Sequence, residues 1–250
     1  MSGGQFFLSS SCGNDSVAML HKAILDGIKN LTVVYCHTGW SSKKWPERID
    51  RVRAYAESHG AKFVELNKDG LTFEELIRSR KGFPMPGKTW CSLHLKAIPF
   101  LMWADEVDPK FEAIVMIGKR RDESIARRDT EEFIYSSENH GGRPVWHSLA
   151  YVTEAQRNAL TIDAGFEVLP HRSKECSPCV NANRKDMRSL DDDDIFKTVS
   201  LETETGQNMF RPHHHMGASG FEQVIKWARS APGKYEKELP GSGCTEGYCE

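Results

Sequence analysis

Seven cysteines supply most of the reactive side chains in this sequence. Cys176 and Cys179 are three positions apart, a spacing at which two thiols can share a metal or cluster, or act as a redox dithiol. Cys244 and Cys249 follow a Pro-Gly-Ser-Gly stretch without apolar periodicity, which predicts a mobile tail. The other three, at positions 12, 36 and 91, are isolated. This pattern is unlike the disulfide framework of a secreted protein.

A run of small residues at positions 9–16 is the second chemically distinctive feature. It follows an apolar stretch and precedes an amphipathic one, so the change of period predicts a strand, a loop and a helix. Small residues let backbone N–H groups surround an anion, and a helix start adds unpaired N–H groups. The sequence therefore predicts a phosphate or sulfate site, although an ordinary strand-to-helix turn remains the alternative. The residues of this predicted site are Ser9, Ser11, Gly13, Asn14, Asp15 and Ser16.

Two more groups of polar residues follow predicted strands. Thr38 and Gly39 come after the second strand and suit a close backbone approach to a ligand. Arg120, Ser124 and Arg127 lie in a strongly basic stretch after the fourth strand. Arginine suits bidentate contact with phosphate, and crowded cations are costly unless an anion joins them. A charged run on a solvated helix is the alternative interpretation.

Strand and helix patterns alternate along most of the chain. This order predicts an α/β fold with a mainly parallel sheet between helices and with ligands at the carboxyl ends of the strands. We expect an α/β domain over residues 1–170 and a smaller, irregular, cysteine-containing segment over residues 171–250 that packs on it. The predicted strands cover residues 6–8, 31–36, 62–66, 113–117 and 145–149. The predicted helices after the first cover residues 46–59, 73–80, 92–104, 153–164 and 221–231.

Charge and hydropathy restrict the location and the partners. The chain has 33 Lys and Arg against 35 Asp and Glu, which gives no whole-chain footprint for nucleic acid. We find no apolar run near the roughly 20 residues that a membrane span needs and no secretory segment, so we expect a cytoplasmic protein and no membrane contact. The aspartates at 191–194 predict a solvated helix start, and the histidines at 213–215 predict a surface loop.

The small-residue loop resembles the PP-loop of ATP pyrophosphatases and phosphoadenosine-phosphosulfate (PAPS) reductases, whose pattern is Ser-Gly-Gly-x-Asp-Ser. Cys12 stands at the first glycine, and Asn14 stands where a lysine is common. Residues 37–39 and 46–48 resemble the Asp-Thr-Gly and Pro-Glu-Thr segments of PAPS reductases, with His37 in place of Asp and Arg48 in place of Thr.

Three later segments resemble the same superfamily. Residues 91–96 resemble its Cys-Thr-x-x-Leu-Lys segment, and Ser92 stands where adenylylsulfate reductases have a second cysteine. Residues 118–127 resemble its nucleotide-holding Gly-x-Arg-x-x-Glu/Gln-Ser-x-x-Arg motif. Cys176 and Cys179 resemble the second cysteine pair of the reductases. In this order, the motifs resemble a PAPS reductase family protein with the adenine nucleotide α-hydrolase-like fold.

The resemblance implies an adenine nucleotide whose phosphates or sulfate lie on the PP-loop, with Lys96 as a nearby cation. It also implies that Cys91, Cys176 and Cys179, with Cys244 or the other tail cysteine, hold a [4Fe–4S] cluster, with zinc as the alternative metal. A protein without any cluster, with reduced cysteines, remains a further alternative.

In the reductases a tail cysteine attacks the sulfur of PAPS, and a thioredoxin-like dithiol then releases sulfite, so Cys244 and Cys249 are the expected catalytic residues. The alternative is an ATP pyrophosphatase that uses Mg²⁺ and ATP to activate a substrate for sulfur insertion, with a cysteine desulfurase as partner. Only that alternative brings in nucleic acid, as in tRNA thiolases and DNA-phosphorothioation proteins. A third hypothesis is a regulator that binds nucleotide without turnover.

Overall fold

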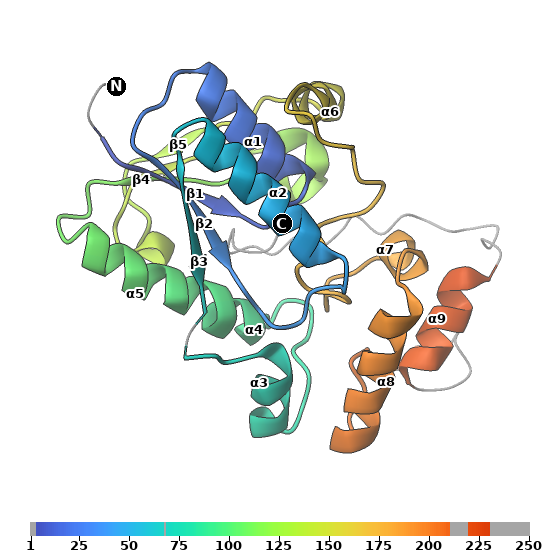
Figure 1. Cartoon of the computed structure of the whole chain (residues 1–250). Helices are drawn as coiled ribbons and strands as arrows, with labels where there is room; N and C mark the ends of the chain where they lie inside the picture. The colour runs from blue at the N-terminus through green and yellow to red at the C-terminus, as the bar shows by residue number, and fades with distance from the viewer. Residues whose placement is uncertain (1–3, 68, 211–219, 231–250) are drawn as a thin grey trace.

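The computed structural model describes residues 4–67, 69–210 and 220–230, and within them one six-stranded sheet has the order β3-β2-β1-β4-β6-β5 (Figure 1). Strand β5 runs antiparallel to β6, and every other pairing in the sheet is parallel. The structure thereby confirms the predicted α/β fold with a mainly parallel sheet. The strands are β1 (Phe6–Ser10), β2 (Leu31–Cys36), β3 (Lys62–Leu66), β4 (Ile114–Met116), β5 (Phe133–Ile134) and β6 (Val145–Trp146).

Helices cover both faces of this sheet because side chains alternate along each strand. Phe6 and Leu8 face a core shared with α1 and α2, whereas Phe7 faces the opposite core beneath α5. Figure 1 shows α1, α2 and α6 on one side of the sheet and α5 on the other. The helices of this part are α1 (Asn14–Leu25), α2 (Trp45–Ser58), α3 (Phe73–Arg80), α4 (Trp90–Ser92), α5 (Ile98–Val107) and α6 (Glu154–Asp163).

Most predicted elements agree with the structure to within a few residues, and the differences occur in short elements. The predicted strand 145–149 ends at Trp146, and the two-residue strand β5 was not predicted. The predicted helix 92–104 begins earlier, at Trp90, and is interrupted by a π-helical turn at Leu93–Ala97. Elements of two or three residues have too few positions to show a period.

The part after residue 170 is more helical than the sequence pattern predicts. Among the described residues it contains α7 (Arg184–Arg188), α8 (Asp192–Thr205) and α9 (Phe221–Arg229). The sequence predicted the extent of α9 and only the start of α8, and it did not predict α7. Asp191 caps α8 by accepting from the N–H of Asp194, so the aspartate run is a helix start, as predicted. Asp194 itself is buried and accepts from the Ser177 hydroxyl. The histidines at 213–215 lie outside the described residues.

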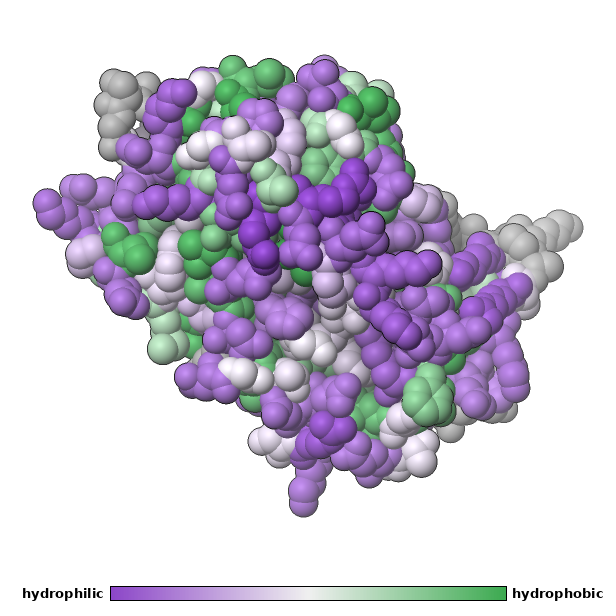
Figure 2. Space-filling model, in the orientation of Figure 1, coloured by the Kyte–Doolittle hydropathy of each residue, from purple (hydrophilic) through white to green (hydrophobic). Residues whose placement is uncertain are grey.

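Two apolar clusters hold these helices in place. Helix α8 and Val180 share a cluster with Trp40 and with Phe73 and Ile77 of α3. A second cluster joins the short helix α7 to α9. In the view of Figure 2 hydrophilic residues predominate and apolar side chains form small separate groups. Within the described ranges we find no helix with the length and hydropathy to cross a membrane.

A buried histidine lies next to the α5 side of the sheet. His140 follows the short strand β5, its ring packs edge-on against Phe100, and its Nδ1 lies 2.9 Å from the Ser137 hydroxyl. Burial lowers the pKa of His140 from 6.5 to about 4, with Lys119 adding to the effect. The folded protein therefore keeps this imidazole neutral in mildly acidic solution.

This histidine should make the protein less stable in acid. Below about pH 6.5 the unfolded chain binds a proton at His140 that the folded chain does not, so stability falls as the pH drops towards 4. Linkage with these pKa values gives a loss of about 2 kcal/mol between neutral pH and pH 5 from this residue. Urea unfolding of the wild type and of His140→Asn, at neutral pH and at pH 5, measures this loss of unfolding free energy. A wild-type pH dependence equal to that of the variant would contradict the prediction.

Candidate anion and cysteine site

The β1–α1 loop, residues 11–13, lies at the carboxyl end of β1, as the sequence predicts. Cys12 has φ +58°, a left-handed conformation that costs a non-glycine residue about 1–2 kcal/mol. Gly13 is the N-cap of α1, and no side chain in the described ranges caps this helix. The N–H groups in the first turn of any α-helix lack intrahelical partners, and here no side-chain cap from the described residues replaces them. Together with the helix dipole, they can receive an anion.

The side chains of the loop mostly support its own shape. The Ser16 hydroxyl accepts from the N–H of Ser11 at 3.1 Å, and the Ser10 hydroxyl accepts from the N–H of Cys12 at 3.1 Å. The Asn14 amide forms two hydrogen bonds with the backbone of Leu169. Asn14 therefore contributes its backbone to the predicted anion site, while its side chain fixes the segment that follows α6.

Asp15 lies between two buried arginines that come from different elements. Arg120, after β4, donates from Nε to Asp15 Oδ1, and Arg157 of α6 lies with Nη1 3.4 Å from Oδ2. The Asp15 side chain keeps 21% exposure, whereas those of Arg120 and Arg157 keep 5% and 9%. Arg120 Nη1 and Arg157 Nε have no hydrogen-bond partner among the described residues. The structure thus brings together Asp15 and Arg120, which the sequence predicts as site residues. Arg157 lies with them, although the sequence did not predict it.

The other predicted residues of the basic stretch have separate environments. Arg127 pairs with Glu123, four residues before it. The buried Ser124 hydroxyl has no hydrogen-bond partner within the part of the chain that the structure describes. Carboxylates of the chain thus pair with Arg120 and Arg127, and binding of an external anion by these cations stays a prediction.

A further buried arginine, Arg48 of α2, contacts the other side of the loop. Its Nε donates to the carbonyl of Cys12 at 2.8 Å, and its two Nη atoms have no hydrogen-bond partner in the described ranges. Burial lowers the pKa of Arg48, yet a guanidinium stays charged in proteins. Three buried arginines thus contact the β1–α1 loop or the first turn of α1: Arg48 at Cys12, and Arg120 and Arg157 at Asp15.

The segment of residues 173–178 crosses from this loop to the end of β2. The Ser173 hydroxyl donates to the carbonyl of Ser11 at 2.9 Å. Thr38 donates from its N–H to Glu175 Oε1 and from its hydroxyl to the Glu175 carbonyl, at 2.8 and 3.0 Å. Burial raises the pKa of Glu175 well above its usual range. Thr38, predicted to contact nucleotide, therefore uses both donors to anchor this segment.

Gly39 allows two segments of the chain to approach each other closely. It has φ +67°, and a Cβ there would lie 2.6 Å from Thr72 Cγ2. Thr72 is the N-cap of α3, and the N–H of Phe73 donates to the Thr38 carbonyl. The close approach predicted for a ligand is made here by the start of α3.

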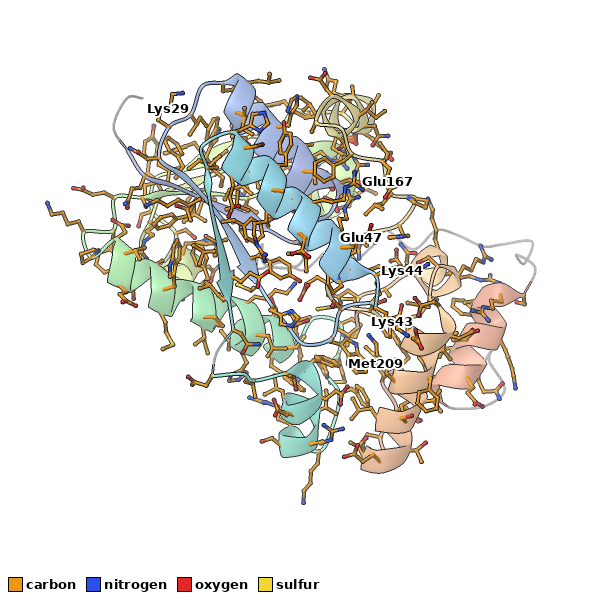
Figure 3. All side chains as sticks on the ribbon, in the orientation of Figure 1. Lys29, Lys43, Lys44, Glu47, Glu167 and Met209 are labelled. Carbon is orange, nitrogen blue, oxygen red and sulfur yellow. The ribbon has the colours of Figure 1, made fainter. Side chains whose placement is uncertain are left out.

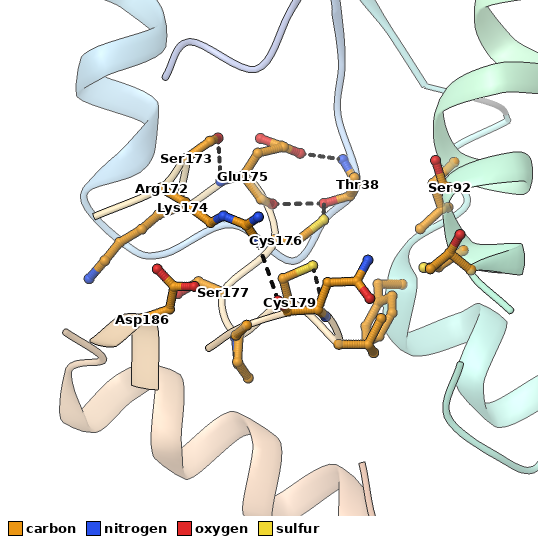
Figure 4. Close-up of a pocket in the computed structure, with 18 of the residues that line it drawn as sticks. Thr38, Ser92, Arg172, Ser173, Lys174, Glu175, Cys176, Ser177, Cys179 and Asp186 are labelled. Atoms are coloured by element: carbon orange, nitrogen blue, oxygen red, sulfur yellow. Dashed lines mark hydrogen bonds between the residues drawn. The ribbon is translucent and has the colours of Figure 1, made fainter. Parts of the chain in front are cut away.

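The three predicted cysteine ligands in the described ranges line one pocket. Cys176 and Cys179 come from the segment after Glu175, and Cys91 comes from α4. Figure 4 shows Cys176 below Thr38, with Ser92 on the helical segment across the pocket. Lys96 and Ser173 also line this pocket, so Ser173 contacts both the pocket and the β1–α1 loop. Lys96 thus belongs to the cysteine pocket, and its charge acts to lower the pKa of Cys91 and Cys176 in the pocket and of Cys36 outside it.

Burial makes the thiols of Cys12, Cys36, Cys91 and Cys176 weak acids. It raises the pKa of Cys176 to about 11, and it raises the pKa of Cys91 further, with the neighbouring thiols of the pair adding to the effect. Burial also raises the pKa of Cys12 and of Cys36 to about 12. At neutral pH these cysteines are therefore protonated thiols unless a cation binds them.

Three cysteines of one pocket are side chains that could help to hold a metal ion or an iron–sulfur cluster. In the described ranges no three His, Cys, Asp or Glu side chains are grouped to hold one metal ion. Cys244 and Cys249, the predicted source of the fourth ligand and of the nucleophile, lie outside the described residues.

Sequence reasoning missed Arg48 and Arg157, although a signal for each was present. Arg48 lies four residues before Val52 and next to Ile49, on the apolar face of α2. Arg157 and Thr161 occupy the buried face of α6, one helical turn apart. A cation within an apolar helical face indicates a specific partner, because burying an unpaired charge is costly.

No protein-family model matches this chain, and no curated protein is similar enough to count as a relative.

Replacing Gly39 should separate a steric effect from a conformational one. Gly39→Ala should lose about 2 kcal/mol more stability than Gly60→Ala, because its Cβ also meets Thr72. Gly60 is the matched control, since it too has positive φ but open space around a Cβ. Denaturant unfolding of both variants measures the difference. Equal losses would mean that the contact with Thr72 relaxes without cost.

Proposed function

We propose that this protein is an enzyme of the PAPS reductase kind, which binds an adenine nucleotide on the β1–α1 loop and releases sulfite in a thiol-dependent reaction. The observation that carries the proposal is the set of three buried arginines around this loop: Arg48, Arg120 and Arg157. One carboxylate, Asp15, lies between two of them. The sequence motifs described above support the choice of nucleotide.

The arginines favour a ligand with several negative charges. A buried cation costs several kcal/mol unless it is paired, and in this site guanidinium nitrogens of all three lack hydrogen-bond partners among the described residues. Phosphate and sulfate oxygens match the fork of a guanidinium. The uncapped first turn of α1 adds backbone donors for the same ligand.

The engagement of Asp15 favours PAPS over a magnesium nucleotide. Each of its carboxylate oxygens faces an arginine, so the protein offers cations in the position where a Mg²⁺ ion would need carboxylate oxygens. We propose that Ser11 and Gly13 of the loop, with Ser9 before it and Ser16 after it, hold the anionic end of the nucleotide together with Arg120 and Arg157. The remaining proposed contacts are Asn14, Thr38, Gly39, Lys96, Ser124 and Arg127.

The nucleophile of the proposed reaction comes from the tail. Burial raises the pKa of the Cys12, Cys36, Cys91 and Cys176 thiols, which makes them poor nucleophiles. A thiolate of Cys244 or Cys249 would attack the sulfur of PAPS, break its bond to the phosphate oxygen and release adenosine 3′,5′-bisphosphate. A thioredoxin-like dithiol would then attack the cysteine sulfur, release sulfite and leave as a disulfide. Because the tail must stay reduced, we place the protein in the cytoplasm.

Cys91, Cys176 and Cys179, with Cys244, are the proposed ligands of a [4Fe–4S] cluster, or of zinc as the alternative. Bound iron or zinc would keep these buried thiols as thiolates and link α4 to the segment after Glu175. In that segment Ser173 also contacts the β1–α1 loop.

A second candidate is the ATP pyrophosphatase reaction, which the partial exposure of Asp15 favours. A carboxylate that keeps 21% exposure at the start of α1 can exchange an arginine for Mg²⁺ when ATP binds. This enzyme would adenylate a substrate for sulfur insertion, with a cysteine desulfurase as sulfur source and a nucleic acid among the substrate classes.

A pair of activity assays distinguishes the two candidates. Purified full-length protein with PAPS and a dithiol should release sulfite, and with ATP and Mg²⁺ it should release no pyrophosphate. Arg157→Ala should weaken PAPS binding about tenfold or more, since a charge-assisted contact contributes about 1.5–3 kcal/mol. The exposed Arg128 provides a matched control, Arg128→Ala, which should bind like wild type. Pyrophosphate release without sulfite would select the second candidate, and equal binding by both variants would remove Arg157 from the site.

The metal content of cysteine variants tests the proposed ligand set. Cys91→Ser, Cys176→Ser and Cys179→Ser should each lose most of the bound iron or zinc, because a cluster that lacks one ligand is usually lost as a whole. Cys36→Ser is the matched control, because Cys36 is partly buried, like Cys91, Cys176 and Cys179, but does not line the pocket. Elemental analysis of anaerobically purified protein gives the result. Full metal content in all three variants would show that the grouping is wrong.

A further inference from the structure

We propose that Arg48 is a positioning residue that orients the peptide between Cys12 and Gly13 for anion binding. The inference rests on the proposed function, because it assumes that the β1–α1 loop receives the anionic part of the nucleotide. Helix α2 would then help to shape the anion site, a role that the amino-acid sequence of the loop does not indicate.

The first step is the geometry of a single peptide unit. Arg48 Nε donates to the carbonyl oxygen of Cys12 at 2.8 Å. In a trans peptide the carbonyl of residue 12 and the N–H of Gly13 belong to one plane and point in opposite directions. Holding the carbonyl towards α2 therefore holds the N–H of Gly13 towards the opposite side of the loop, next to the start of α1.

The second step is that this peptide needs support. Cys12 has φ +58°, which a side chain with a Cβ adopts at a cost. Its side chain is fully buried, and its N–H donates to the Ser10 hydroxyl at 3.1 Å. The bond from Arg48 fixes the other end of the residue. Two hydrogen bonds thus hold a conformation that glycine would adopt freely.

The third step is that Arg48 is itself held in place. Its guanidinium lies 5.9 Å from the Trp45 ring centroid and 5.6 Å from that of Phe166. The nearest carboxylate, Glu167, is 3.9 Å from Nη1, beyond hydrogen-bonding distance. Figure 3 labels Glu167 on the segment after α6, beside α2. A rigid side chain is what a positioning residue requires.

Arg51 provides a matched control on the same helix. Its guanidinium lies 5.0 Å from the Phe166 ring centroid and 4.0 Å from Glu167, so it shares two surroundings of Arg48. Its hydrogen bond goes to the carbonyl of Gly165 and not to the loop. A variant of Arg51 therefore removes a cation with a similar ring contact, although a more exposed one, while leaving the Cys12 peptide untouched.

The first experiment measures ligand affinity by calorimetry, with PAPS and inorganic pyrophosphate as the probes. Binding of either probe by the wild-type protein tests the proposed function. The ratio of the dissociation constants of variant and wild type tests the inference. Arg48→Met and Arg48→Lys should each bind the probes about tenfold more weakly, whereas Arg51→Met should stay within about twofold of wild type. Lysine keeps the charge without Nε, so wild-type affinity in Arg48→Lys would overturn the positioning role, as would equal losses in the Arg48 and Arg51 variants.

A double-mutant cycle separates positioning from general stability. Adding Arg48→Met to Cys12→Gly should cost less than about threefold in affinity, because glycine accepts positive φ without the bond. Adding it to Cys12→Ala, which retains the Cβ, should still cost about tenfold. Equal losses in the two backgrounds would mean that Arg48 acts only through packing.

If the wild-type protein binds neither probe, that result contradicts the proposed function but not the inference about Arg48. A measurement without ligand then tests the inference. The amide resonance of Gly13 in ¹⁵N-labelled protein reports on the peptide directly. It should shift in Arg48→Lys and keep its wild-type position in Arg51→Met. An unchanged Gly13 resonance in Arg48→Lys would overturn the inference.

Discussion

The arrangement of the site depends on the ion pairs of Asp15. This carboxylate, in the first turn of α1, holds Arg120 from the segment after β4 and Arg157 from α6. Since both arginines are nearly buried, neither could stay in place without a negative partner except at a cost of several kcal/mol. One side chain therefore fixes the relative position of three elements around the carboxyl end of the sheet.

The same constraint gives the site its electrostatic character. Arg120 also pairs with Asp122 and Arg157 with Glu154, but these two carboxylates keep 40% and 70% side-chain exposure, against 21% for Asp15. Arg48 adds a third buried cation, whose nearest carboxylate is beyond hydrogen-bonding distance. An excess of buried positive charge lowers stability when the site is empty and favours anions that enter it. This cost, together with the positive φ of Cys12, is of the kind that proteins retain at functional sites.

The sequence predicts those features of the fold that depend on local patterning, and it misses those that depend on distant contacts. Apolar runs located β1, β2 and β3, and the amphipathic period located α2 and α3. Helix α7 was missed because its five residues are mostly charged, although Asn183 is a recognisable cap. The approach of Thr72 to Gly39 and the bond between Arg48 and Cys12 join residues more than 30 positions apart. The residue type at such a position indicates an unusual backbone conformation or a specific contact, but it does not indicate which distant residue makes the contact.

The segment of residues 173–176 connects the two halves of the site within one short stretch. Ser173 bonds to the carbonyl of Ser11, Glu175 bonds twice to Thr38, and Cys176 lines the cysteine pocket. Residues that line the cysteine pocket therefore contact both the end of β2, through Glu175, and the β1–α1 loop, through Ser173. Because protein interiors are close-packed, the positions of the pocket and of the loop depend on the same few contacts.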